Sequence, residues 1–168
     1  MTRRIILDRA IADDLWQLIP AGDAVPAGGK IIVPLAAWLA GHAALSARGG
    51  QVGVWLKPDD EPGLLARDVA RLPLIAVQFP QFTDGRGYSI ARLLRERFGY
   101  RGELRAFGDV LRDQIFYMAS VGFNAFALKD GKSLEEALSA FEDFFEAYQT
   151  SVARPVPYYR RRLGGAPA

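Results

Sequence analysis

Residues 84–89 combine the side-chain types that bind a small anion. They follow the apolar run Leu74–Phe79 and open a segment of helical pattern, so they should form a loop beyond the carboxyl end of a strand. Glycines let a ligand approach the backbone, a helix start offers free N–H groups, and an arginine supplies a planar fork of donors. The predicted ligand-binding residues of this loop are Asp84, Gly85, Arg86, Gly87, Tyr88 and Ser89. The alternative is a tight strand-to-helix loop in which Asp84 or Ser89 caps the helix.

A second polar segment, residues 105–114, follows from the next predicted strand and should open toward the same edge of the sheet. Arg105 lies on that strand beside Glu103 and needs solvent or a partner, so the strand is either at an edge or lines a polar site. We predict Arg105 and Asp109 as catalytic residues. Three further residues are predicted to bind the ligand: Arg112, Asp113 and Gln114. The structural alternative is that Asp109 caps the next helix and Asp113 complements its dipole.

Composition excludes several kinds of chemistry. The chain has no cysteine and one histidine, His42, which rules out disulfides, thiolate-held iron–sulfur clusters, a cysteine nucleophile and histidine-based zinc sites. His42 lies among alanines and leucines and is interpreted as a helix-surface or core residue rather than a base. A formal net charge of +2 is too weak to indicate nucleic acid. We therefore expect no metal site and no nucleic-acid partner.

The elements that must position these residues alternate between short apolar runs and segments of helical period, which is typical of parallel βαβ units. The predicted strands are Lys30–Val33, Val52–Leu56, Leu74–Phe79, Glu103–Phe107 and Phe123–Leu128. The predicted helices are Leu35–Ser46, Gly63–Arg71, Tyr88–Phe98, Val110–Val121 and Leu134–Gln149. A complete eight-stranded barrel takes about 250 residues. The sequence therefore predicts an α/β fold with about five mostly parallel strands in an open sheet and helices on both faces, with a half-barrel as the alternative.

The predicted domain organisation is a single α/β domain over residues 30–150. Residues 1–29 form a turn-rich lead-in with one strand near Arg4–Leu7, and residues 151–168 form a basic, mobile tail. The apolar run near the amino terminus is too short for a secretory signal, and no stretch reaches the length of a membrane span. These features indicate a cytoplasmic protein with no membrane contact.

The run Phe79–Arg95, followed by Gly102–Gln114 and by Gly122 with Phe123, resembles a bacterial family of unknown function. Its members are commonly described as oxidoreductases involved in sulfite reduction. The resemblance is specific through Phe79–Phe126 and looser from Leu35 to Leu74. It implies a place in assimilatory sulfur metabolism beside the sirohaem sulfite reductase, without an established mechanism. This chain departs from the pattern before Gly122, where members tend to have Arg-Cys, so a role based on that cysteine does not carry over.

The resemblance thus implies an accessory protein or oxidoreductase that acts with sulfite reductase. An oxidoreductase needs a redox centre, and the residues show no nicotinamide or flavin fingerprint, so the cofactor is unknown. Binding of a flavin or NADP by a loop without a recognisable fingerprint is an alternative. The alternative function is a non-redox enzyme or sensor that binds a phosphorylated or sulfated small molecule at the 84–89 loop. Whether the chain is an enzyme and whether it forms a homo-oligomer are not decided by these residues.

Overall fold

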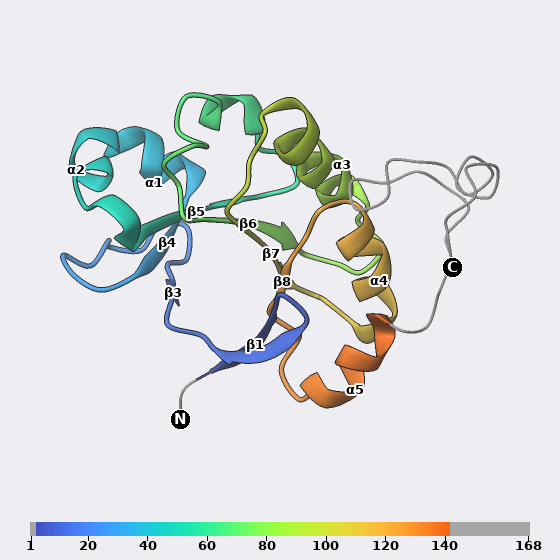
Figure 1. Cartoon of the computed structure of the whole chain (residues 1–168). Helices are drawn as coiled ribbons and strands as arrows, with labels where there is room; N and C mark the ends of the chain where they lie inside the picture. Colours follow the sequence, from blue (N-terminus) through green and yellow to red (C-terminus); the bar gives the residue numbers. More distant parts are fainter. Residues whose placement is uncertain (1–2, 142–168) are drawn as a thin grey trace, which may run out of the picture.

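The computed structural model describes residues 3–141, which form one eight-stranded sheet (Figure 1). The strand order is β2-β1-β8-β7-β6-β5-β4-β3. Strands β3 to β8 run parallel, and β1 is antiparallel to both β2 and β8. The strand bounds are β1 Arg4–Leu7, β2 Ala10–Asp13, β3 Gln17–Leu18, β4 Ile31–Pro34, β5 Val52–Leu56, β6 Leu74–Phe79, β7 Glu103–Gly108 and β8 Ala125–Phe126.

Helical segments follow the parallel strands from β4 onward. The α-helices are α1 Leu35–Ala40, α2 His42–Ser46, α3 Arg86–Arg92, α4 Arg112–Ser120 and α5 Leu134–Leu138. Three short 3-10 turns are η1 Gly49–Gln51, η2 Pro62–Leu65 and η4 Ser139–Phe141, and η3 Leu93–Arg97 is a π-helical turn that extends α3. None of the helices among residues 3–141 is long and apolar enough to cross a membrane.

The helices all pack against one face of the sheet, around which they form an arc (Figure 1). Alternate strand residues such as Val54, Val77 and Leu104 point to this face and bury against helix residues such as Trp38 and Leu94. Because consecutive parallel strands are also neighbours in the sheet, right-handed connections place every crossover helix on the same side. The half-barrel alternative is therefore the observed fold, and helices do not cover both faces.

The other face forms a second, smaller core to which no described helix contributes. Its buried residues are Ile5, Ile32, Trp55, Leu74, Ala76, Phe107 and Ala127. All but Ala127 lie on strands, between the residues that point to the first core. The Trp55 and Phe107 rings meet edge to face with centroids 5.7 Å apart. The Trp55 Nε1 donates to the carbonyl of Ile19, 2.9 Å away. Large aromatic side chains thus fill the interior of the curled sheet.

The connection between β2 and β3 shows how strongly the sheet curls. These two strands lie at opposite edges of the sheet, yet only residues 14–16 join them. Four successive Cα–Cα steps span at most about 15 Å, so the two edges must approach one another. We refer to residues 14–16 as the strap. The strap makes the sheet a nearly closed half-barrel.

The strand count is eight rather than about five. The five predicted strands are all present, and the predicted strand at Arg4–Leu7 is β1; the hairpin partner β2 and the two-residue β3 complete the sheet. The predicted lead-in thus contributes three strands to the sheet, β1 to β3, and Ile5 and Ile6 of β1 are buried. The last predicted helix begins as α5 and continues as the 3-10 turn η4, while the rest of it, to Gln149, and the basic tail lie outside the described residues.

Candidate functional site

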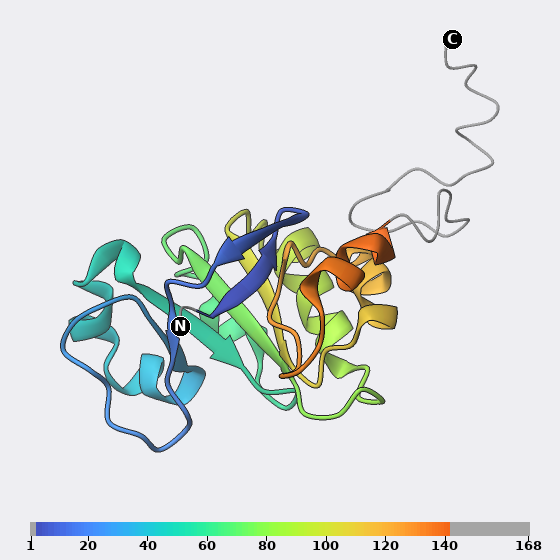
Figure 2. The same cartoon turned by 90° about the horizontal axis from the view of Figure 1, so that it is seen from below.

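Four loops gather at the carboxyl edge of the parallel strands, the edge where ligand sites of such folds are found. They are residues 57–61 after β5, 80–85 after β6, 109–111 after β7 and 129–133 after β8. Polar contacts link each loop to the next. The turn of the β1–β2 hairpin lies at the other end of the strands (Figure 2).

Arg86 links the first two loops. It begins α3, and its Nε and Nη2 donate to the two carboxylate oxygens of Asp84 at 3.0 and 2.7 Å. Its Nη1 donates to Asp59 in the loop after β5. The hydrogen bond and charge of Arg86 lower the pKa of Asp84, and the two carboxylates raise the pKa of Arg86. The guanidinium fork is therefore engaged by two carboxylates, one of them on a neighbouring loop.

The three predicted arginines have separate partners. Arg105 lies inside the half-barrel, where its side chain is 4% exposed. Its guanidinium bonds Asp14 of the strap at 2.9 Å and Glu103 at 2.8 Å. Burial raises the pKa of Glu103, and Arg105 offsets part of that rise. The strand with Glu103 and Arg105 is central rather than at an edge, and its polar side chains face the interior.

Arg112 turns toward the carboxyl-terminal helices instead. Its Nε donates to the carbonyl of Glu136 at 3.2 Å, and its Nη2 donates to the Ser139 hydroxyl at 3.0 Å. It also lies 3.5 Å from the exposed carboxylate of Asp113. These contacts tie α4 to α5 and η4. The structure thus brings neither Arg105 nor Arg112 into contact with Arg86.

Asp109 and Gln114 instead hold the backbone of Phe82. Asp109 accepts the Phe82 N–H at 3.1 Å, and the Gln114 amide donates to the Phe82 carbonyl at 2.8 Å. Lys129, from the loop after β8, donates to the other oxygen of Asp109 at 3.0 Å. The hydrogen bond from Lys129 is the largest cause of a lowered pKa at Asp109. The Gln114 oxygen accepts the Leu111 N–H at 3.2 Å, which fixes the amide in turn.

The side chain of Phe82 remains 57% exposed between these anchors. On α3, the helix that follows the 80–85 loop, the half-buried ring of Tyr88 packs edge to face on Tyr117, with centroids 5.0 Å apart. Tyr117 lies on α4, one turn after Gln114, whose amide holds the Phe82 carbonyl. Tyr117 is 54% exposed. We name Phe82, Tyr88 and Tyr117 the aromatic patch.

The two predicted glycines differ in their surroundings. A Cβ added to Gly87 would lie 2.6 Å from the Phe79 ring, so a glycine here lets α3 pack closely on β6. A Cβ on Gly85 would meet only the Tyr88 ring at 3.9 Å. Ser89 is exposed on α3, and its hydroxyl makes no hydrogen bond within the described part of the chain. Gly87 thus has a packing reason that needs no ligand.

Gly108 has a conformational reason of its own. It ends β7 with a φ of +101°, and an added Cβ would overlap the carbonyl oxygen of Phe79. The same carbonyl accepts the N–H of Asp109 at 2.7 Å. This close approach of the ends of β6 and β7 brings Asp109 within reach of the 80–85 loop.

Sequence reasoning did not single out Asp59, Phe82 or Lys129. Asp59 and Lys129 follow predicted strands, so the sequence predicted that they lie in loops. It could not predict their ion pairs with other loops, because those pairs depend on the order of the strands in the sheet. The exposure of Phe82 had no signal beyond a phenylalanine between proline and glycine turns. Among residues 3–141, no group of three or more histidine, aspartate or glutamate side chains is arranged to hold a metal ion.

A second feature of the same edge is a cavity of about 280 Å³ at the ends of β4 and β5. It lies between residues 21–23, the start of α1, Lys57 and Asp60. The Asp60 carboxylate accepts the Lys57 backbone N–H at 2.8 Å, which shapes the loop. This cavity lies toward the β3 side of the edge, away from the aromatic patch.

Together, the sheet and its linked loops define a parallel α/β half-barrel protein with its polar and aromatic residues at the carboxyl edge. Residues 53–159 match the model of a family described as "Bacterial protein of unknown function (DUF934)", and the chain belongs to this family. The match covers β5 to α5 and includes every residue of the aromatic patch. No curated protein and no solved structure matches the chain.

Proposed function

We propose that this protein is a cytoplasmic accessory protein of assimilatory sulfite reduction that binds sulfite reductase through the aromatic patch. The resemblance of Phe79–Phe126 to proteins described in sulfite reduction supports the pathway. The patch supports the binding role, and it lies within the same residues. In this role the chain supplies a docking surface, and the reduction of sulfite belongs to the reductase.

The observation that carries the proposal is the way in which Phe82 is held. Two polar side chains, Asp109 and Gln114, fix its N–H and its carbonyl, while its ring stays exposed. These hydrogen bonds tie the 80–85 loop to the loop after β7 and to α4, but they leave the ring of Phe82 in solvent. A partner gains from it, because a preorganised aromatic anchor loses less conformational entropy on binding. Burial of a phenylalanine ring contributes about 1.5–3 kcal/mol.

A small anion at the 84–89 loop would have to compete with carboxylates that already bind Arg86. Arg86 already bonds Asp84 and Asp59, so an incoming phosphate or sulfate has to displace carboxylates from its fork. Arg105 and Arg112 do not contribute to this loop. The geometry therefore favours a protein partner over a small anion at this position.

The test is binding of the full chain to sulfite reductase of the same organism, measured by surface plasmon resonance. Phe82→Ala should weaken binding about tenfold or more, since truncation of a buried anchor costs at least 1–2 kcal/mol. Leu64→Ala, which removes another exposed apolar side chain at 53% exposure, is the matched control and should bind as the parent does. Thermal unfolding of both variants should stay near that of the parent.

A genetic measurement gives an independent answer. Deletion of the gene should impair growth on sulfite as the sole sulfur source, and the parent gene should restore it while the Phe82→Ala gene should not. No measurable binding to the reductase, together with normal growth of the deletion strain on sulfite, would contradict the proposed function.

A further inference from the structure

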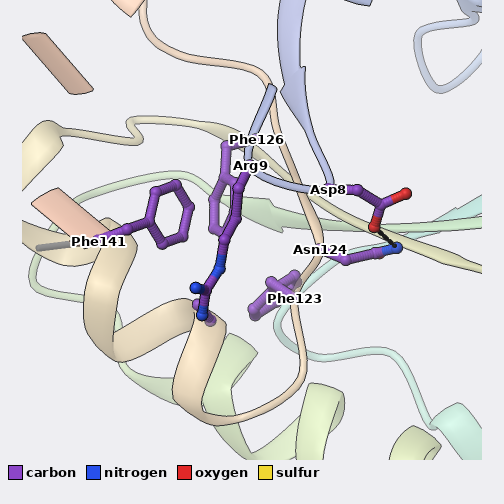
Figure 3. Close-up of a pocket in the computed structure, with 7 residues that line it drawn as sticks. Asp8, Arg9, Phe123, Asn124, Phe126 and Phe141 are labelled. Atoms are coloured by element: carbon purple, nitrogen blue, oxygen red, sulfur yellow. Dashed lines mark hydrogen bonds between the residues drawn. The ribbon is translucent and has the colours of Figure 1, made fainter. Parts of the chain in front are cut away.

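A cavity of about 270 Å³ lies at the amino edge of the sheet, at the opposite end of the strands from the aromatic patch. Its walls come from the β1–β2 turn, the residues around the start of β8, the end of α4, and η4 (Figure 3). The charged, amide and aromatic residues that line it are Asp8, Arg9, Phe123, Asn124, Phe126 and Phe141. None of them belongs to the predicted site.

The floor of the cavity is aromatic and rigid. Phe123 and Phe126 are 3% and 1% exposed, so the core holds their rings in place and only a small part of each reaches the cavity. Phe141 meets Phe126 edge to face with centroids 5.8 Å apart. Such rings favour a flat apolar group packed against them.

Arg9 supplies a cation at the mouth of this aromatic floor. Its side chain runs between the Phe141 ring and Phe123 (Figure 3), and its guanidinium carbon lies 5.3 Å from the Phe141 centroid. Within residues 3–141, Arg9 makes no ion pair with a carboxylate. Arg86, Arg95 and Arg105, by contrast, bond carboxylates or carbonyls.

The turn fixes Arg9 in this position. Asp8 and Arg9 have φ angles of +48° and +62°, a left-handed conformation that usually selects asparagine or glycine. The Asp8 carboxylate accepts from the Asn124 amide at 3.0 Å, and the Asp8 N–H donates to the Asn124 carbonyl at 2.8 Å. Asn124 therefore turns Asp8 away from its neighbour, as Figure 3 shows. The fork of Arg9 is left facing the cavity.

We propose that this cavity binds a small aromatic carboxylate, with the ring on the phenylalanine floor and the carboxylate on the Arg9 fork. A guanidinium recognises a planar carboxylate through two parallel hydrogen bonds. The volume is below that of pockets for drug-sized ligands, which start at about 300 Å³, and suits a single ring with one acidic group. This inference does not depend on the proposed function, because the two surfaces share no residue.

The experiment is a titration of the ¹⁵N-labelled full chain with benzoate, followed by NMR. Benzoate should produce saturable shifts at the amides of Arg9, Asn124 and Phe126. Benzamide, which keeps the ring but lacks the charge, and acetate, which lacks the ring, should each bind at least tenfold more weakly. Equal binding of acetate and benzoate would overturn the aromatic part of the proposal, and no saturable shift with benzoate would overturn all of it.

Variants locate the site. Arg9→Gln should weaken benzoate binding about tenfold, and Arg9→Lys should weaken it less because the charge remains without the fork. Ala119→Leu, which fills the cavity and leaves Arg9 in place, should also abolish binding. Arg67→Gln, an exposed arginine between η2 and β6, is the charge-matched control and should bind benzoate normally. Unchanged affinity in both Arg9→Gln and Ala119→Leu would overturn the inference, whatever the result of the reductase experiment.

Discussion

Asp68 is a buried carboxylate on which three donors converge. Trp38 Nε1 lies 3.2 Å from it, His42 Nε2 3.1 Å and an Arg71 nitrogen 3.3 Å. Burial by itself raises the pKa of Asp68, but the hydrogen bonds from His42 and Trp38 and the charges of His42 and Arg71 outweigh it and lower the pKa. The single histidine, which the sequence suggested to be a surface or core residue, thus takes part in a structural network.

Asp68→Asn should destabilise the fold at pH 7 by about 1–3 kcal/mol, because the network loses a charged acceptor in a buried position. The folded-state pKa lies below that of the unfolded chain, so the stabilisation is present above about pH 4 and is lost as the pH falls through the folded-state value. Urea unfolding of parent and variant at several pH values measures the difference. It should be largest near neutral pH and shrink below pH 4.

Asp113→Asn is the control for this effect. Its side chain is 89% exposed, so its replacement should change stability by no more than about 0.5 kcal/mol. If Asp68→Asn lost the same stability at every pH, the stabilisation would come from the packing of the side chain at this position rather than from its negative charge.

At the scale of elements, the sequence predicted the parallel strands well because each is a short apolar run bounded by turn residues. It predicted helices from β4 onward from the spacing of apolar residues, such as Ile90 and Leu94 in α3. The predicted helix Gly63–Arg71 was wrong, because only the 3-10 turn η2 and further turns lie there. It missed β2, whose hairpin turn Asp8-Arg9 has no glycine, and β3, which has only two residues. It also missed the π-helical end of α3, since no local pattern marks a change of helix type.

The sequence predicted the positions of the loops better than it predicted the contacts between them. The sequence placed Asp84, Arg86, Asp109 and Gln114 at the correct edge of the sheet, but it gave no partner for them. Those partners depend on which strands are neighbours and on how the sheet curls. Whether these residues bind a ligand stays a prediction.

Gly87 and Gly85 give a matched test of what the glycines do. Gly87→Ala should destabilise the fold by about 1–3 kcal/mol, because the added methyl group forces α3 away from the Phe79 ring. Gly85→Ala should have little effect, since open space surrounds its backbone. Thermal unfolding of the two variants compares them directly. Equal effects would contradict the packing reason for Gly87.

At the scale of the whole molecule, Arg105 connects the strap to the centre of the sheet. Asp14→Ala removes one of its two carboxylates and leaves a buried guanidinium only partly compensated, which should cost about 3–5 kcal/mol. Asp13→Ala, at the exposed neighbouring position, should cost far less. Denaturant unfolding measures both. A small effect of Asp14→Ala would show that the strap is held by the aromatic interior rather than by this ion pair.

The strap has a further consequence for how the chain behaves in a crowded solution. A parallel sheet that stays open presents two rows of unpaired backbone groups, onto which strands of other chains can add. Here the outermost strands are short, with four residues in β2 and two in β3, and the strap holds both over the half-barrel. A chain that lost residues 1–18 would offer β8 and β4 as bare templates instead. We therefore expect residues 4–18 to protect the chain from intermolecular strand addition and from the aggregation that follows it.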